Sequence, residues 1–386
     1  MKNPAAPQLI LIDSHTLEPY SVQGFQFLAR AASFAEHWPS NVQLWLPGPA
    51  ISEDRMLRAT ALPRWPDNLQ VCFGPAPQIR LGPIRIKTKS SFRAWAAKEL
   101  RQIAAGPNKP LLYFRTLKLP ALLSPLLTTL GIRYFFEPHE IFFESARNPA
   151  KFRAMEKKVD AAALHLYPIS SGLATGLKQE FGFKDSVTIA PLGHSGANLQ
   201  LPAYDPAAEA RLLFTGSLLR WKGLETVLTA AHHLGVSFDI VGDAGGREYY
   251  ESYCRERGYT NVAFHGHVAP EDLSKHYLPG TICVLPLSRA NIAMKYTSPL
   301  KLFEYLASGR PVVAGDVPSV REIVRHKEHA ILLEPENTDA WTRGLQDLLA
   351  NRTAAAEIAG RGRELATSCT WSVRAKALVA SFLAHA

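Results

Sequence analysis

The stretch that decides the fold runs from Arg211 to Val313. It opens RLLFTGSLLRWKGLETVLTAA (211–231), continues through FDIVGD (238–243), NVAFHGHV (261–268) and ICVLPL (282–287), and ends YTSPLKLFEYLASGRPVV (296–313). Apolar runs of strand length alternate with amphipathic helical segments, and this alternation predicts βαβ units around a parallel sheet. Because open α/β sheets bind ligands beyond the carboxyl ends of their strands, we expect the functional residues in the turns that follow the apolar runs.

The first such turn joins TGSLL to WKG. Gly216 ends a strand and lets the backbone approach a ligand closely. Lys222 precedes a predicted helix whose first turn carries positive partial charge and free N–H groups, so a lysine there suits a phosphate. The alternative is that Lys222 is one of the many solvated lysines found at loop–helix junctions.

The second turn is SPLKLFE. Ser298 and Pro299 are expected to begin a helix, since Pro is favoured in the first helical turn. The amides of 300–302 (Leu300, Lys301, Leu302) then lack partners within the helix and can face an anion. Glu304 follows one turn on, and its carboxylate can accept both hydroxyls of a ribose. Ordinary helix capping by Ser-Pro is the alternative interpretation.

The order of these motifs resembles one known family. Gly216, Lys222-Gly223, IVGD, VAFHGHV and FEYLASGRPVVA follow one another as in the donor-binding domain of family-4 glycosyltransferases, which are retaining enzymes of the GT-B fold. The resemblance is dense in the C-terminal half and thin in the N-terminal half. It implies an α/β chain with two Rossmann-like domains facing across a cleft, a nucleotide-sugar donor, and an acceptor hydroxyl.

The resemblance also implies residue roles. Lys222 and Glu304 match catalytic positions of the family, and His139, in the strand-end sequence EPHE, matches a histidine that faces the donor sugar. The further residues expected at the donor are Gly24, in the first strand–helix turn, and Gly216, Ser217, Arg220, Tyr296, Ser298, Leu300 and Lys301.

Three positions depart from the family pattern. Ser217 stands where the family has an arginine, so Arg220 is the candidate for the second positive charge. Tyr296 stands where the family has a glutamate that grips the donor sugar, and Pro299 replaces a glycine and so removes an amide donor. These changes put the identity of the sugar in doubt.

Composition bounds the remaining choices. The chain has 386 residues, 47% of them hydrophobic and 20% charged, with a formal net charge of +9. This charge favours anionic partners, but no nucleic-acid recognition motif is present. Four scattered cysteines and an N-terminal apolar run too short for a signal peptide lead us to expect a cytoplasmic protein without a structural metal.

The N-terminal half is expected to form a second α/β domain. Strands are predicted at 9–12, 42–46, 69–73, 111–115 and 163–170, with another ending at Glu137, and a helix at 23–37. We expect an acceptor-side domain at 1–200, a nucleotide-sugar-binding domain at 201–370, and a final amphipathic helix at 371–386 that packs back on the first domain, as GT-B proteins have it.

A basic segment at 80–101 has two open interpretations. It carries seven Lys or Arg and one acid, with Phe92 and Trp95 interleaved. It is either a solvated basic helix or a patch that docks on an anionic membrane surface through its cations and aromatic rings. Many relatives use lipid-linked acceptors, so a peripheral location on the inner face of the membrane is an expectation here.

The sequence thus predicts a metal-independent hexosyltransferase. It would move a sugar from a nucleotide-diphosphate sugar to a glycan or lipid-linked acceptor, with no cofactor beyond the donor and no D-x-D motif placed to hold a metal. Two alternatives stay open because of Ser217 and Tyr296: a non-catalytic binding subunit of the same fold, and a nucleotide-sugar epimerase.

Overall fold

The structure is a computed structural model. It describes residues 6–17, 22–60, 62, 64–76, 78–81, 84–87, 89–182, 187–288 and 293–385. The chain divides into two compact units: unit 1 is Met1–Pro191 with Trp371–Ala386, and unit 2 is Leu192–Thr370. The division falls at 191/192 rather than at 200/201, and the final helix is counted with unit 1.

Unit 1 is built on a parallel five-stranded sheet in the order β3-β2-β1-β6-β7. The strands are β1 (Leu9–Ile12), β2 (Val42–Pro47), β3 (Leu69–Gly74), β6 (Leu111–Phe114) and β7 (Arg133–Phe136). Its helices are α1 (Val22–His37), α2 (Glu53–Thr60), α3 (Lys89–Ala104), α4 (Lys118–Leu130), α5 (Pro149–Ala162), α6 (Ser171–Phe181) and α14 (Trp371–His385).

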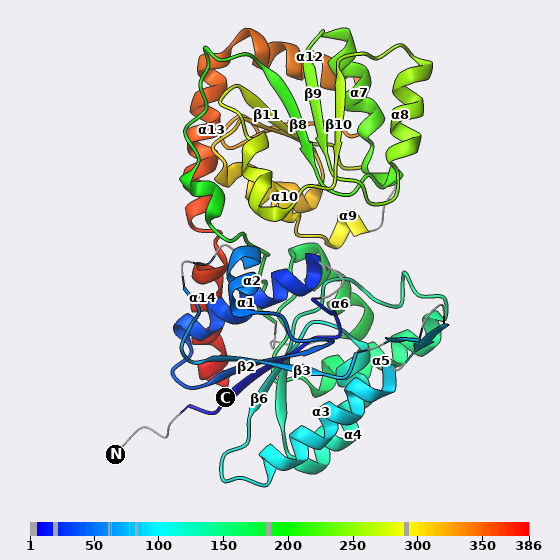
Figure 1. The fold of residues 1–386 in the computed structure, drawn as a ribbon, viewed down its shortest axis with the longest axis vertical. Coiled ribbons are helices and arrows are strands. Elements are labelled where there is room, and N and C mark those ends of the chain that lie inside the picture. Colours follow the sequence, from blue (N-terminus) through cyan, green and yellow to red (C-terminus); the bar gives the residue numbers. More distant parts are fainter. Residues whose placement is uncertain are drawn as a thin grey trace. The chain divides into compact units, whose positions relative to one another are not determined.

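Alternate residues of the unit 1 strands face two cores. On one face, Leu9 and Leu11 pack with residues of α1 and α14, which lie side by side (Figure 1). On the other face, Ile10 and Ile12 pack with residues of α3 and α4. Both faces of β1 are therefore covered, which explains why its sequence, LILI, shows no polar alternation.

Unit 2 is built on a parallel six-stranded sheet in the order β10-β9-β8-β11-β12-β13. The strands are β8 (Arg211–Thr215), β9 (Ser237–Val241), β10 (Val262–Gly266), β11 (Thr281–Leu285), β12 (Val312–Gly315) and β13 (Ile331–Leu333). The helices are α7 (Leu224–His233), α8 (Arg247–Glu256), α9 (Ala293–Tyr296), α10 (Leu300–Ala307), α11 (Pro318–Arg321), α12 (Thr338–Ala350) and α13 (Arg352–Thr367), with 3-10 turns η1 (Ala197–Gln200), η2 (Arg220–Lys222) and η3 (Pro270–His276).

Two expectations about unit 1 are wrong. The predicted strand at 163–170 is reduced to bridges that Leu166 makes with Phe136 and Val187. Ser170, at the end of this segment, caps α6 by accepting from the Leu173 amide at 3.2 Å. The basic segment 80–101 is helical only from Lys89 onward, because an antiparallel pair, β4 (Gln78–Leu81) and β5 (Ile84–Lys87), precedes the helix. Apolar runs as short as those in 163–170, β4 and β5 do not let the hydrophobic pattern distinguish a strand from a loop.

Candidate functional site

The carboxyl end of β8 places Lys222. Strand β8 ends at Thr215, and Gly216 follows with a φ of +141°, a conformation that L side chains rarely adopt. The turn η2 then brings Lys222 back toward the strand, so that its Nζ lies 3.4 Å from the position a Cβ on Gly216 would take. The ammonium also lies 5.6 Å from the ring centroids of Phe214 and of Trp221.

This half-buried lysine titrates unusually low. Burial and, as the smaller cause, the neighbouring positive charge of Lys301 together lower the pKa of Lys222 to about 8. A group whose charged form is disfavoured by burial and by a like charge gains from an anionic partner. The Lys222 environment therefore favours the binding of a phosphate.

Lys301 lies in the first turn of α10, and Glu304 lies one turn further on. The helix begins at Leu300 with Pro299 as its N-cap residue, and Lys301 Nζ donates to Glu304 Oε2 at 2.6 Å. One expected free amide has a partner after all: the N–H of Leu302 donates to the carbonyl of Pro299 at 2.9 Å. The amides at Leu300 and Lys301 remain the ones predicted to face an anion.

Helix α10 is tied to the end of β8. The Thr215 amide donates to the Tyr305 hydroxyl at 2.7 Å, and Tyr305 is fully buried. Since Tyr305 follows Glu304 directly, this bond fixes the first turns of α10 beside the turn that carries Lys222. Lys301 bonds to Glu304 and its charge acts on Lys222, so residues 222, 301 and 304, up to 82 positions apart in the sequence (304 − 222), converge on one edge of the unit 2 sheet.

Glycines make this edge compact. A Cβ on Gly242 (φ +136°) would lie 1.9 Å from the carbonyl oxygen of Gly216, and one on Gly246 would lie 1.9 Å from that of Leu218. Only glycine allows the loops after β8 and β9 to approach so closely. This packing explains why glycine stands at position 242 in IVGD and at position 246 in AGG.

The other residues expected at the donor lie as follows. The guanidinium of Arg220, an exposed residue, stacks 4.1 Å from the ring centroid of Tyr249. Ser298 is buried, and its hydroxyl accepts from the Leu192 amide at 2.9 Å. Ser217 and Tyr296 are half-buried.

Gly24 belongs to unit 1 and has a packing role. It lies in the first turn of α1, where an added Cβ would meet the carbonyl oxygen of Thr16 at 2.6 Å. The neighbouring pair Tyr20-Ser21, the alternative match for a glycine pair, lies outside the described residues.

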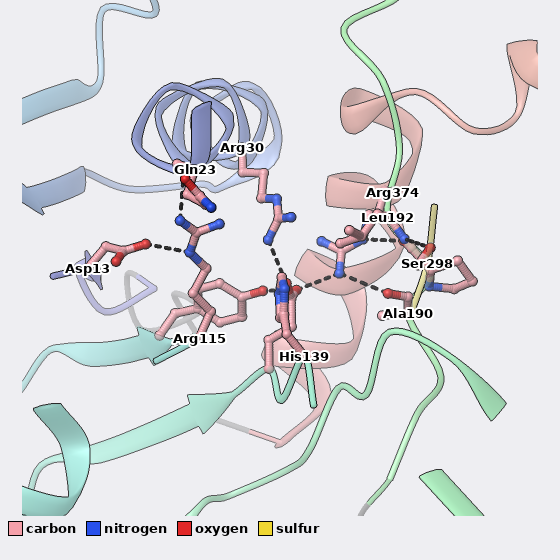
Figure 2. A network of polar contacts seen from close by, with 12 residues as sticks. Asp13, Gln23, Arg30, Arg115, His139, Ala190, Leu192, Ser298 and Arg374 are labelled. Atoms are coloured by element: carbon pink, nitrogen blue, oxygen red, sulfur yellow. Dashed lines mark hydrogen bonds and ion pairs between the residues drawn. The ribbon is translucent and has the colours of Figure 1, made fainter. Parts of the chain in front are cut away.

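The strand ends of unit 1 carry a network of charged groups (Figure 2). Asp13 follows β1, Arg115 follows β6, and Glu137 follows β7, so that three adjacent strands each deliver a buried charged residue to one edge. His139 extends the network by an Nε2–Glu137 Oε1 contact of 2.6 Å. This edge is the place where ligands bind in open parallel sheets.

Glu137 is the centre of that network. Its Oε1 accepts from Arg30 Nη1 at 2.6 Å, and its Oε2 accepts from Arg374 of α14 and from the Tyr113 hydroxyl. Burial alone would raise the pKa of Glu137, but the two guanidiniums hold it well below its ordinary value. Glu137 is therefore an anion that joins α1, β6 and α14.

The ionised Glu137 fixes the state of His139. Burial lowers the pKa of His139 to about 4, against the raising effect of Glu137, so the ring is neutral near pH 7. Because Nε2 faces a carboxylate, Nε2 carries the proton and Nδ1 is left as an acceptor. With 26% of its side chain exposed, His139 can accept a hydrogen bond from a ligand hydroxyl.

The pair Asp13 and His15 was missed from the sequence. His15 Nδ1 lies 2.7 Å from Asp13 Oδ1, and Arg115 Nε donates to Asp13 Oδ2. Burial would raise the pKa of Asp13, but Arg115 and His15 lower it to about 2. The signal that could have found this group is a charged residue directly after an apolar strand, in LILI-Asp13 and LLYF-Arg115.

The aromatic half of the membrane hypothesis is wrong. Phe92 is 4% exposed, and the Trp95 ring packs 5.1 Å from the ring centroid of Trp45. Phe92 is buried and Trp95 is half-buried against the same core, so neither ring is freely available to a bilayer interface. Lys98 and Arg101 are exposed, so their positive charges can still contact an anionic surface, as the hypothesis requires.

The described residues contain neither a membrane-spanning helix nor a metal-binding cluster. No helix there combines the length and the apolar character that a bilayer crossing requires. The described part of the chain also contains no group of three or more His, Cys, Asp or Glu side chains arranged to hold a metal ion.

Comparison with known proteins points to one class of enzyme. Residues 209–351 match the family model of glycosyl transferases group 1. An uncharacterized glycosyltransferase of Methanocaldococcus jannaschii is 28% identical over 148 residues, which are 37% of this chain and 36% of that protein. A GDP-mannose-dependent alpha-(1-6)-phosphatidylinositol monomannoside mannosyltransferase of Mycobacterium tuberculosis is 26% identical over 183 residues, 42% of this chain and 48% of that protein. The chain therefore spans less than half the length of these relatives.

Solved structures match over almost the whole chain. Sucrose-phosphate synthase from Thermosynechococcus elongatus has a TM-score of 0.71 at 18% identity, covering 99% of this chain and 100% of that one. Anabaena HepE, solved in complex with UDP, has a TM-score of 0.72 at 15% identity with the same coverage. The predicted GT-B fold of two Rossmann-like domains is confirmed, and the sequence likenesses support a glycosyltransferase.

Proposed function

We propose that this chain is a retaining glycosyltransferase that moves a sugar from a nucleotide-diphosphate sugar to an acceptor hydroxyl. The observation that carries the proposal is the convergence of Lys222, Lys301 and Glu304 at one edge of the unit 2 sheet. All three lie inside the segment that matches glycosyl transferases group 1. Retention of the anomeric configuration rests on the family-4 resemblance.

The chemistry requires fixed positive potential at the departing diphosphate. As the bond from the anomeric carbon to the phosphate oxygen breaks, negative charge grows on the β-phosphate and the sugar gains oxocarbenium character. Preorganised donors aimed at such developing charge usually make the largest catalytic contribution. Lys222 and the amides of Leu300 and Lys301 are proposed to supply them without a metal, while Glu304 accepts the ribose hydroxyls.

His139 is proposed to contact the transferred sugar. Its neutral ring, oriented by Glu137, offers Nδ1 as a hydrogen-bond acceptor rather than a positive charge. On this proposal His139 helps to position the sugar and does not protonate the leaving group.

The acceptor is proposed to be a lipid-linked or cell-envelope glycan. One relative is named for the transfer of mannose to a phosphatidylinositol mannoside, and another, from Rhodococcus erythropolis, is named a D-inositol 3-phosphate glycosyltransferase. The net charge of +9 suits an anionic acceptor or surface. A cytoplasmic, membrane-peripheral location belongs to the same proposal.

A thermal-shift panel tests the nucleotide site directly. Wild type and the double variant Lys222→Ala/Glu304→Ala are compared with UDP, GDP, ADP, dTDP and CMP. A ligand present at 100 times its dissociation constant should add about 2.7 kcal/mol of stability. We expect one diphosphate to stabilise wild type and not the variant; a wild type that none of them stabilises would contradict the proposal.

Incubation with donor then separates the enzyme from its alternatives. A transferase releases nucleoside diphosphate faster when an acceptor is added. A non-catalytic binding subunit binds the nucleotide without turnover. An epimerase converts the donor sugar with no acceptor present.

A further inference from the structure

The resemblance leaves the second positive charge at the diphosphate unassigned, because Ser217 stands at the family arginine. We propose that the side chain of Lys301 is this second charge, and that it leaves Glu304 to bind the β-phosphate when a nucleoside diphosphate enters. The proposal rests on the nucleotide site described above and goes beyond the backbone role expected of Lys301.

Arg220 is poorly placed for the task. Its guanidinium stacks on Tyr249 of α8 at 4.1 Å from the ring centroid, and the residue is exposed. A cation–π contact of this kind holds the charge over the ring. The turn η2 thus directs Arg220 toward α8, while Lys222 in the same turn points back toward Phe214 and Gly216.

Lys301 is placed where Arg220 is not. It lies in the first turn of α10, the turn whose amides are predicted to face the anion. The bond between Tyr305 and Thr215 holds this turn beside the end of β8, next to the turn of Lys222. The Lys301 ammonium has three N–H donors, and its 2.6 Å bond to Glu304 uses one of them.

The ion pair with Glu304 is suited to exchange. Both side chains are partly exposed, at 27% for Lys301 and 28% for Glu304, and partly exposed pairs of this kind contribute little stability. When Lys301 turns to a phosphate, the Glu304 carboxylate becomes free for the ribose hydroxyls. The anion also relieves the repulsion between Lys301 and Lys222, whose charges affect one another.

The test compares diphosphate with monophosphate. Isothermal titration calorimetry gives the dissociation constants of UDP, UMP, GDP and GMP for wild type, Lys301→Met, the rival candidate Arg220→Met, and the control Lys275→Met on an exposed lysine of the same unit. We expect wild type to bind the diphosphate of its base more tightly than the monophosphate. Lys301→Met should reduce that ratio roughly tenfold or more, since one charge-assisted bond is lost, Arg220→Met should reduce it less, and Lys275→Met should leave it unchanged.

Inorganic pyrophosphate, which has no ribose, tests the exchange. We expect Glu304→Gln to bind pyrophosphate more tightly than wild type, because Lys301 is released, and Lys301→Met to bind it more weakly. All variants are first checked for cooperative melting near the wild-type temperature.

The outcomes separate the two proposals. A ratio that Arg220→Met reduces and Lys301→Met preserves would overturn the assignment of Lys301 while leaving the nucleotide site intact. Pyrophosphate binding that Glu304→Gln leaves unchanged would overturn the exchange. If no diphosphate of the panel, UDP and GDP included, binds wild type, the proposed nucleotide site is wrong and so is the role of Lys301.

Discussion

At the scale of single residues, Lys222 is the side chain on which the proposed reaction depends most. We predict that Lys222→Ala lowers turnover by about 10²-fold or more, by analogy with the loss of one preorganised donor at a developing charge. The measurement is the initial rate of nucleoside diphosphate release from the donor found by the panel. Lys275→Ala, on an exposed lysine of the same unit with 75% of its side chain accessible, serves as control. Near wild-type turnover in Lys222→Ala would sink the assignment.

Asp160 should make stability depend on pH. Asp160 is 4% exposed, both of its carboxylate oxygens lack a hydrogen-bond partner, and burial, with Glu156 nearby, raises its pKa to about 8. The folded state therefore keeps a proton that the unfolded chain releases at an ordinary aspartate pKa. It follows that the free energy of unfolding falls as pH rises from about 4 to about 8.

Asp160→Asn should remove this fall, because an amide stays neutral at every pH. We predict that the melting temperature of the variant, measured by scanning calorimetry, is close to that of wild type near pH 4, exceeds it increasingly as the pH rises to about 8, and shows the full difference at pH 9. Asp54→Asn, on a helix position 73% exposed, controls for the loss of a charge. A variant that is less stable than wild type at pH 9 would show that the carboxylate has a partner there.

For the proposed nucleotide site, the sequence predicts where the residues fall in the fold better than it predicts which way their side chains point. Lys222 and Glu304 stand out because motif spacing fixes where they fall relative to predicted strands and helices. The choice between Arg220 and Lys301 depends on which way a side chain leaves its turn, and no pattern in the sequence encodes that. The Glu137–Arg374 pair joins residues 237 positions apart, so it could only follow from the placement of the last helix.

At the scale of elements, the loops after β8 and β9 depend on Gly242. We predict that Gly242→Ala destabilises the protein by roughly 2 kcal/mol or more and weakens diphosphate binding. The new methyl would lie 1.9 Å from the Gly216 oxygen, on a backbone with φ +136°. Urea unfolding measures the loss, and Gly360→Ala in open space on α13 should instead stabilise by roughly 0.5–1 kcal/mol. Equal effects of the two changes would refute the steric argument.

Helix α3 carries the remaining prediction about membranes. With Phe92 and Trp95 in the core, any binding to anionic vesicles must come from cations such as Lys98 and Arg101. We therefore predict co-sedimentation with anionic vesicles in low salt that disappears near 0.5 M salt, where the screening length falls to roughly 4 Å. Lys98→Glu/Arg101→Glu should reduce it. Background co-sedimentation of wild type in low salt would dispose of the idea.

Elements were predictable where their hydrophobic pattern was long or fully apolar. LILI and ICVL form buried strands as expected, since every residue finds a core on one face or the other. The segment 163–170 has the composition of a strand, yet only Leu166 makes bridges there. His165 pairs its Nε2 with the Thr188 hydroxyl and Ser170 caps the start of α6, so the side chains of this segment are directed by tertiary contacts and not by a strand ladder.

At the scale of the whole molecule, two units with separate cores could be predicted from ordered motifs and chain length. The point where the chain returns to unit 1 was expected only by analogy. The structure supplies its physical reason: the Phe382 ring of α14 stacks 4.1 Å from that of Phe135 and contacts further aromatic rings of the unit 1 core. Such an aromatic cluster contributes large buried area, so α14 is part of that core.

This division leads to the last prediction, which concerns unit 2 alone. The residues proposed to hold the diphosphate (Lys222, Lys301 and Glu304) all lie in Leu192–Thr370, a continuous segment with its own six-stranded sheet and its own cores. We predict that the segment 192–370 folds and binds the nucleoside diphosphate of the panel within about an order of magnitude of the full chain's affinity, because no binding group is lost. It should catalyse no transfer, since His139 and the other charged groups of unit 1 are missing.

Calorimetry on the isolated segment decides the matter, with Lys222→Ala in the same segment as control. A segment that melts cooperatively but binds no diphosphate would mean that unit 1 provides essential nucleotide contacts, and the site described on unit 2 would then be incomplete. Binding that Lys222→Ala abolishes would instead show that unit 2 holds the diphosphate and that unit 1 is needed for the transfer of the sugar.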